Sequence, residues 1–230
     1  MNTVTSLAEA FYEISMMDAP LKQRLAAYAG RLRELNRPFA EAYDRLVARL
    51  EKAKVGEGAP GIGEIMPSFV LPDQNGKLIS LEELTRSGRV VISFNRGHWC
   101  PFCKLELRGL ADSQSKFAED GASVVSIMPE RELYTRRAVQ ELDERINILS
   151  DIDNGFALSI GLVMWVGDEV MQLMQGRGFD LNEFQGNNGW FLPVPATFIV
   201  DHTGRIIARS INPDFRTRME IDEIIRALRQ

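Results

Sequence analysis

The sequence predicts an α/β fold with a mixed central sheet, preceded by a helical extension. From residue 90 to residue 160, patterns typical of strands and of helices alternate, and a strand hairpin followed by a helix ends the chain. This order is typical of a sheet that contains parallel and antiparallel strands and carries helices on its faces. A chain of 230 residues is long enough for one substantial domain with an appendage.

Composition and charge exclude several functional classes. The 27 basic and 32 acidic residues are mixed along the chain and give a net charge of −5, so no basic face for phosphates is expected. No apolar run reaches the roughly 18 residues of a membrane span, and residues 1–7 lack the pattern of a secretory signal. We therefore expect a cytoplasmic protein that binds neither nucleic acid nor membranes.

Residues 1–55 are predicted to form the helical extension, with helices broken near Pro20 and Pro38. The second helix carries an apolar stripe at spacings of four and three residues, formed by Leu21, Leu25, Tyr28, Leu32 and Leu35. We expect a homodimer, but the stripe has two interpretations, packing on the main domain or an arm for dimerisation. A stripe alone does not identify its partner, so both stay open.

Residues 56–63 are rich in Gly and Pro and are predicted to connect the extension to a domain over residues 64–230. This domain should open with a hairpin around Asn75-Gly76, after which Ser80 and Glu83 form the capping box of a short helix. The strands expected next cover residues 90–94, 122–128, 146–149, 197–200 and 205–210. The expected helices cover residues 100–117, 130–144, 154–160 and 216–228, with an irregular insertion that ends near Trp190.

The two cysteines of the chain, Cys100 and Cys103, lie at the predicted junction between a buried strand and a helix. Unpaired N–H groups and the positive end of the helix dipole favour a thiolate at this point. We expect Cys100 to be the attacking thiolate and Cys103, one turn further on and less exposed, to be the resolving thiol. Two ordinary buried cysteines, or a zinc site completed by His98 and His202, are weaker interpretations of so close a pair.

The segment Phe94-Asn-Arg-Gly-His-Trp-Cys-Pro-Phe-Cys-Lys-Leu-Glu-Leu-Arg108 resembles the active-site segment of peroxiredoxin-like proteins of the alkyl hydroperoxide reductase and thiol-specific antioxidant (AhpC/TSA) family. Residues 66–76 are similar to the first hairpin of that family, and residues 195–204 to its late hairpin. The resemblance implies a thioredoxin-like fold and an antioxidant peroxidase in which Cys100 forms a sulfenic acid that Cys103 resolves. It also implies a peroxide substrate, a thioredoxin-like or glutathione-type reductant, and no cofactor or metal.

Other features are similar to a second group of proteins. Where typical peroxiredoxins have Pro and then Thr or Ser before the peroxide-attacking cysteine, this sequence has Ser93 and Gly97. The Trp-Cys-Pro-Phe-Cys motif and Val194-Pro195 resemble thioredoxin and glutaredoxin, whose cis-proline faces the cysteine pair. Three functions therefore stay open: a thiol peroxidase, a thiol-disulfide oxidoreductase, and a redox sensor whose disulfide state changes its contact with a partner.

Three residues are expected to support the cysteine pair. Arg96 either donates hydrogen bonds to the thiolate or the peroxide, or binds a carboxylate. Trp99 either shields the site or packs in the core. Pro195 is expected to be preceded by a cis peptide bond, as in a turn that faces a redox site.

Further polar and apolar side chains have plainer expectations. His98 is expected to lie in a surface loop, and the alternative is that it tunes the pKa of the thiolate. Glu106 and Arg108 are expected to lie on a solvated face of the helix. The large side chains of the insertion are expected to pack together, with an apolar substrate pocket or docking surface as the alternative; they are Met164, Trp165, Met171, Met174 and Trp190.

Overall fold

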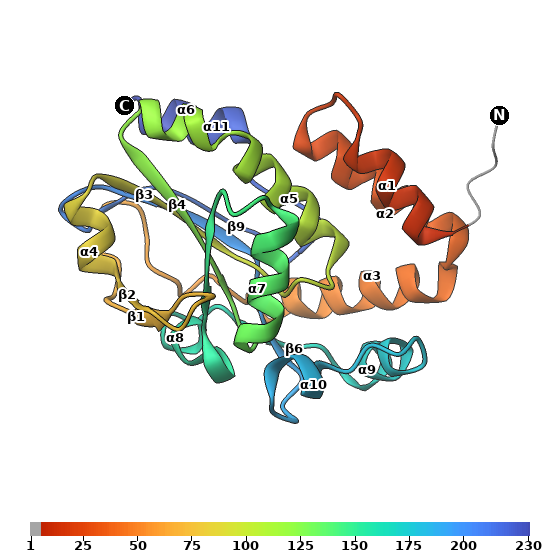
Figure 1. Ribbon diagram of the computed structural model, residues 1–230. Helices are drawn as coiled ribbons and strands as arrows, with labels where there is room; N and C mark the ends of the chain where they lie inside the picture. The colour runs from red at the N-terminus through yellow and green to blue at the C-terminus, as the bar shows by residue number, and fades with distance from the viewer. Residues whose placement is uncertain (1–5) are drawn as a thin grey trace.

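The computed structural model describes residues 6–230 and has a five-stranded mixed sheet at its centre (Figure 1). The strand order is β5-β4-β3-β8-β9, with β4 parallel to β3 and β5, and β8 antiparallel to β3 and β9. The strands span β3 (Arg89–Phe94), β4 (Ala122–Met128), β5 (Asn147–Ser150), β8 (Ala196–Val200) and β9 (Ile206–Ile211). The mixed α/β fold predicted from the sequence is therefore confirmed.

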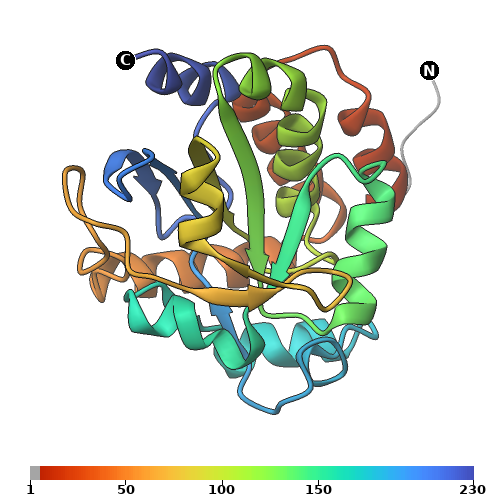
Figure 2. The same cartoon turned by 60° about the vertical axis from the view of Figure 1, so that its left-hand side comes forward.

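Both faces of the sheet are covered. Because successive side chains of a strand point to opposite faces, each strand contributes to two cores. Val91 of β3 faces a core built with helices α5 (Pro101–Asp112), α6 (Gln114–Glu119), α7 (Glu132–Glu141) and α11 (Ile221–Leu228). Val90, Ile92 and Phe94 face the other core, which includes the hairpin of β1 (Val70–Pro72) and β2 (Leu78–Ser80), α4 (Leu81–Arg86) and α8 (Gly155–Ser159). Figure 2 shows α4 and this hairpin in front of the sheet. Among residues 6–230, no helix is both long and apolar enough to cross a bilayer.

The N-terminal extension is helical, as predicted, with α1 (Leu7–Ser15), α2 (Leu21–Leu35) and α3 (Arg37–Lys52). Leu21, Leu25, Tyr28 and Leu32 of the α2 stripe are buried within the chain itself. Helix α2 packs against α5, and the carboxylate of Glu220 accepts hydrogen bonds from the N–H groups at the start of α2. The extension therefore packs along α5 and contacts the segment that precedes α11.

Three details of the predicted elements are wrong. The insertion is regular: β6 (Val163–Trp165) pairs with β7 (Phe191–Pro193), and α9 (Asp168–Gln175) and α10 (Leu181–Gln185) lie between them. Elements this short contain too few residues to show a clear period. The last helix begins at Ile221 rather than Arg216, because Asp214 folds the preceding segment into a turn by accepting from the N–H of Arg216 and from that of Thr217. The helix predicted over 100–117 is interrupted at Ser113, where α5 ends and α6 starts.

Candidate active site

Cys100 occupies the N-cap position of α5, directly after the loop that follows β3. Pro101 follows inside the first turn, where its missing N–H leaves no hydrogen bond unmade. Cys103 lies one turn further along the helix, and both cysteines are free thiols. The expectation that Cys103 is the less exposed of the two is wrong, because both are 0% exposed.

Arg96 is the principal partner of Cys100. Its Nη2 donates a hydrogen bond to the Cys100 Sγ at 3.0 Å, and its backbone N–H donates to the Cys103 Sγ at 3.4 Å. The guanidinium is buried and lies 3.8 Å from the centre of the Phe215 ring. Of the two roles considered for Arg96, the structure places it on the thiol rather than on a carboxylate.

A second buried arginine, Arg218, approaches the other sulfur. Its Nη2 lies 3.6 Å from the Cys103 Sγ, and its Nε donates to the Glu106 carboxylate at 2.6 Å. Glu106 also accepts from the hydroxyls of Ser93 at 3.2 Å and Thr197 at 3.4 Å. The expectation that Glu106 lies on a solvated face is therefore wrong, since it closes a buried polar network. Sequence reasoning missed Arg218, because no spacing links it to the cysteines.

The two thiols respond to this environment in opposite directions. Burial alone would raise the pKa of Cys100, but the hydrogen bond from Cys103 and the charges of Arg96 and Arg218 together hold that pKa well below its usual value. Burial also raises the pKa of Cys103, and the hydrogen bond and charge of Cys100 raise it further. The pair therefore favours one thiolate, on Cys100, with a neutral thiol beside it.

The pH dependence of the thiolate tests this assignment. In a Cys103→Ser variant, whose hydroxyl can still donate to Cys100, thiolate absorbance is expected to be present at pH 7. Because the pKa of Cys100 is lowered, the signal should stay constant as the pH rises above neutrality and disappear only on acidification. An ultraviolet pH titration measures this, and a signal that first develops well above neutral pH would contradict the assignment.

The loop that carries Arg96 is fixed by Glu130, a fully buried carboxylate. Glu130 accepts from the backbone N–H of His98 at 2.7 Å and pairs with the His98 Nδ1 at 2.7 Å. The His98 ring stacks on Tyr134 with centroids 5.0 Å apart, and its side chain is 15% exposed. The expectation of a surface histidine is wrong, and the contacts of His98 anchor the loop.

Gly97 explains why this loop departs from the peroxiredoxin pattern. Its φ of +147° is strained for other residues, and an added Cβ would lie 2.5 Å from the Trp99 Nε1 and 2.7 Å from the Glu130 Oε1. A threonine at this position would not fit the observed loop. The loop therefore places the Arg96 guanidinium, rather than a hydroxyl, beside Cys100.

Gly97→Ala is expected to destabilise the protein by about 1–3 kcal/mol and to slow alkylation of Cys100, because the loop must move. Denaturant unfolding and the rate of iodoacetamide modification measure the two effects. Gly178→Ala is the control: it also has a positive φ, +77°, but its Cβ would meet no atom within 4 Å. Equal effects of both substitutions on alkylation would show that close packing at Gly97 does not set the reactivity.

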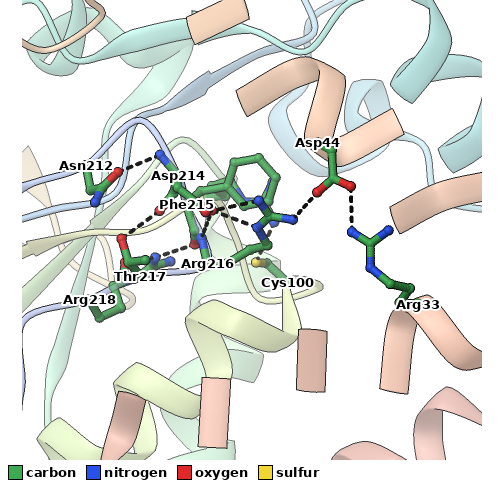
Figure 3. A network of polar contacts seen from close by, with 10 residues as sticks. Arg33, Asp44, Cys100, Asn212, Asp214, Phe215, Arg216, Thr217 and Arg218 are labelled. Carbon is green, nitrogen blue, oxygen red and sulfur yellow. Dashed lines mark hydrogen bonds and ion pairs between the residues drawn. The ribbon is translucent and has the colours of Figure 1, made fainter. Parts of the chain in front are cut away.

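Aromatic side chains and an ionic network cover the thiols. Tyr43 of α3 and Phe215 pack edge to face with centroids 4.7 Å apart, and both lie against the Arg96 guanidinium. Figure 3 shows Asp44 of α3 between Arg33 and Arg216, which donate to it at 2.5 and 2.7 Å. This network joins α2 and α3 to the segment that carries Phe215. Any oxidant must therefore pass this cover to reach Cys100.

The remaining predicted residues divide between contact with the site and plain packing. Trp99 is partly buried, and the centre of its ring lies 5.4 Å from the Arg96 Cζ. Together with Met174 it also lines an apolar cavity of about 280 Å³. Met164 and Trp190 are buried as expected for packing, whereas Trp165 is exposed. Arg108 is partly exposed on α5 and forms ion pairs with Asp112 and Asp143.

The prediction of a cis bond before Pro195 is wrong, since no cis peptide bond occurs among residues 6–230. β7 ends at Pro193 and β8 begins at Ala196, and neither a turn nor a bend lies between the two strands. The N–H of Val194 donates to the carbonyl of Leu162 at 2.7 Å and continues the pairing of β6 with β7. No tight turn is present that would favour the cis form.

Paired thiols at the start of the helix that follows a central strand, in a mixed sheet of this order, define a thiol-dependent oxidoreductase with a thioredoxin-like fold. The chain belongs to the AhpC/TSA family, whose model matches residues 62–209. The family resemblance inferred from the sequence is thereby confirmed.

Individual relatives are similar at low identity. The chain is 26% identical to peroxiredoxin Bcp of Escherichia coli (strain K12) over 170 residues, which cover 73% of this chain and 95% of that protein. It is 25% identical to the thiol-disulfide oxidoreductase ResA of Bacillus cereus over 179 residues, or 77% and 82% of the two chains. The crystal structure of peroxidoxin BcpB from Mycobacterium tuberculosis superposes with a TM-score of 0.57 at 23% identity, covering 73% of this chain and 96% of that chain.

Proposed function

We propose that the protein is a peroxiredoxin-like thiol peroxidase that reduces hydrogen peroxide or organic hydroperoxides. The observation that carries the proposal is the buried Arg96 guanidinium, whose Nη2 lies 3.0 Å from the Cys100 Sγ. A fixed cation at this position stabilises both the attacking thiolate and the oxygen that becomes negative as the O–O bond breaks. Membership of the AhpC/TSA family supports the same activity.

The proposed cycle has three balanced steps. The Cys100 thiolate attacks one peroxide oxygen, the O–O bond breaks, and the released alkoxide or hydroxide takes up a proton, which leaves a sulfenic acid on Cys100. Cys103 then attacks the Cys100 Sγ, and its thiol proton leaves with the hydroxide as water while a disulfide forms. A thioredoxin-like dithiol, or two molecules of a glutathione-type thiol, then reduces the disulfide and is itself oxidised to a disulfide. The cycle needs no metal or organic cofactor.

A thiol-disulfide oxidoreductase is the second candidate, and two observations favour it. The cysteines are separated by only two residues, and ResA is among the relatives. The burial of both sulfurs counts against a protein disulfide as substrate, because a large substrate would have to displace the aromatic cover. A small peroxide requires less opening, which is why we place the peroxidase first.

Stopped-flow oxidation of the reduced protein separates the candidates. Hydrogen peroxide and cumene hydroperoxide should oxidise it far faster than they oxidise free cysteine. A rate no faster than that of free cysteine would reject the peroxidase. Reduction of insulin disulfides without peroxide turnover would favour the oxidoreductase, and failure of both activities with a change in assembly on oxidation would favour a redox sensor.

The organisation and location of the protein belong to the same proposal. We propose residues 1–55 as a helical extension of a domain over residues 64–230, acting in the cytoplasm. The homodimer stays a prediction, and because four of the five stripe residues of α2 are buried within the chain and only Leu35 is exposed, another surface would have to form most of the interface. Light scattering of the reduced and oxidised protein measures the assembly state.

A further inference from the structure

We infer that Arg218, oriented by Glu106, activates Cys103 for its attack on oxidised Cys100. The inference rests on the proposed role of Cys103 as the resolving thiol, in either of the two candidate reactions. Arg218 touches a reacting atom and would be a catalytic residue, whereas Glu106 acts through Arg218 and would be a positioning residue.

The geometry assigns one arginine side chain to each sulfur. The Arg96 guanidinium donates to Cys100, and the Arg218 Nη2 approaches the Cys103 Sγ at 3.6 Å. The backbone N–H of Arg96 donates to the same Cys103 Sγ at 3.4 Å. Cys103 is therefore faced by a cation and a second donor, which both favour its thiolate.

Hydrogen bonds from two of its nitrogen atoms fix the orientation of the Arg218 guanidinium. Its Nε donates to Glu106 at 2.6 Å, and its Nη1 donates to the carbonyl oxygens of Phe215 and Thr217. Figure 3 shows the segment from Asn212 to Arg218 folded on itself through such contacts. A buried ion pair is weak evidence for stability by itself, because removing two charges from water is costly. The contact with sulfur gives the pair a chemical role.

The charge on Cys100 explains when Cys103 becomes active. In the reduced site, the negative charge of the Cys100 thiolate disfavours ionisation of Cys103, which lies one turn away. Conversion of Cys100 to a neutral sulfenic acid or mixed disulfide removes that opposition, while Arg218 and the Arg96 N–H remain in place. The Cys103 thiolate then attacks the Cys100 Sγ, the S–O or S–S bond breaks, and the proton from Cys103 ends on the leaving hydroxide or thiolate.

A test of the resolving step must not depend on peroxidase activity. Methyl methanethiosulfonate is a small reagent that converts Cys100 to its methyl disulfide and releases methanesulfinate; Cys103 then expels methanethiolate. Acid quenching and mass spectrometry follow both species with time. In the Glu106→Gln/Arg218→Met double variant, which leaves no buried charge unpaired, the second step should slow about tenfold to a hundredfold and the methyl disulfide should accumulate.

Arg226→Met is the matched control, because Arg226 is exposed on α11 in the same C-terminal segment. It should leave both steps unchanged. An unchanged second step in the double variant, or equal slowing of the two steps, would overturn the inference. If the double variant does not fold, Arg218→Lys carries the test: lysine keeps a positive charge for Glu106 but cannot serve Glu106 and Cys103 together, so the second step alone should slow.

A titration distinguishes activation from a structural role. The charged and titratable groups that face Cys103 are Cys100, Arg96, Arg218 and Tyr43. In a Cys100→Ser background, loss of Arg218 and Glu106 should move the appearance of Cys103 thiolate absorbance to higher pH. An unmoved titration would contradict the inference. A wild-type protein that reacts with methyl methanethiosulfonate in two steps but not with peroxide would reject the peroxidase and leave this inference intact.

Discussion

Cys100→Ser is expected to abolish oxidation by peroxide, with a loss on the order of 10³-fold or more. A serine hydroxyl is not ionised at neutral pH, so the attacking thiolate disappears. Cys103 is not expected to replace it, because the Arg96 guanidinium, which would stabilise the developing oxyanion, lies on the side chain at position 100. Stopped-flow measurement of the first oxidation step gives the result directly.

Cys103→Ser is the matched control for this prediction. It should keep a fast first oxidation, since Arg96 still lies on Cys100, but lose the internal disulfide and with it recycling by a dithiol. Continued exposure to peroxide should convert Cys100 to the sulfinic acid, which mass spectrometry detects. A Cys100→Ser protein that still reacts rapidly with peroxide, or the reverse behaviour of the two variants, would remove Cys100 from its assigned role.

Arg96→Met is expected to slow the first oxidation step by about 10²- to 10³-fold. The substitution keeps an unbranched side chain against Phe215 but removes the charge that stabilises the thiolate and the developing oxyanion. The pKa of Cys100 should rise in the same variant, because the charge of Arg96 is one of the causes that hold it down. The pH dependence of the oxidation rate separates the two contributions: the loss that persists at high pH belongs to the oxyanion.

Arg108→Met tests whether the effect of Arg96 is specific. Arg108 lies on α5, only a few residues from the cysteines, but it is partly exposed and pairs with acidic groups at the surface. Its replacement should change the oxidation rate little. If Arg96→Met and Arg108→Met slow oxidation equally, a fixed cation at Cys100 is not what drives the reaction.

Local signals carried most of the fold prediction. The capping box formed by Ser80 and Glu83 is present, with both reciprocal hydrogen bonds. The apolar run of β3 is the central strand, and the break before Cys100 starts a helix. Signals of this kind depend on residues within one or two turns of each other, so they persist in any tertiary arrangement.

Predictions that depended on distant residues failed or were not made. Glu106 has a charged side chain on a helix, and its neighbours in sequence do not indicate the buried contact with Arg218. Pro195 matches a thioredoxin motif, but its peptide bond is trans, and no turn separates β7 from β8. Three-residue strands such as β6 and β7 form because they pair with each other across the insertion.

The amino-acid pattern alone was sufficient to determine the alternation of strands and helices, the helix-start position of Cys100 and the closeness of Cys103. These follow from short-range backbone chemistry, which acts between neighbours in the chain. Folding in three dimensions decided that both sulfurs are sealed from solvent and that Arg96 and Arg218 each approach one of them. Burial and Coulomb interactions depend on distance in space, so the contribution of Arg218, which lies 115 residues from Cys103 in the sequence, arises only when these segments pack together.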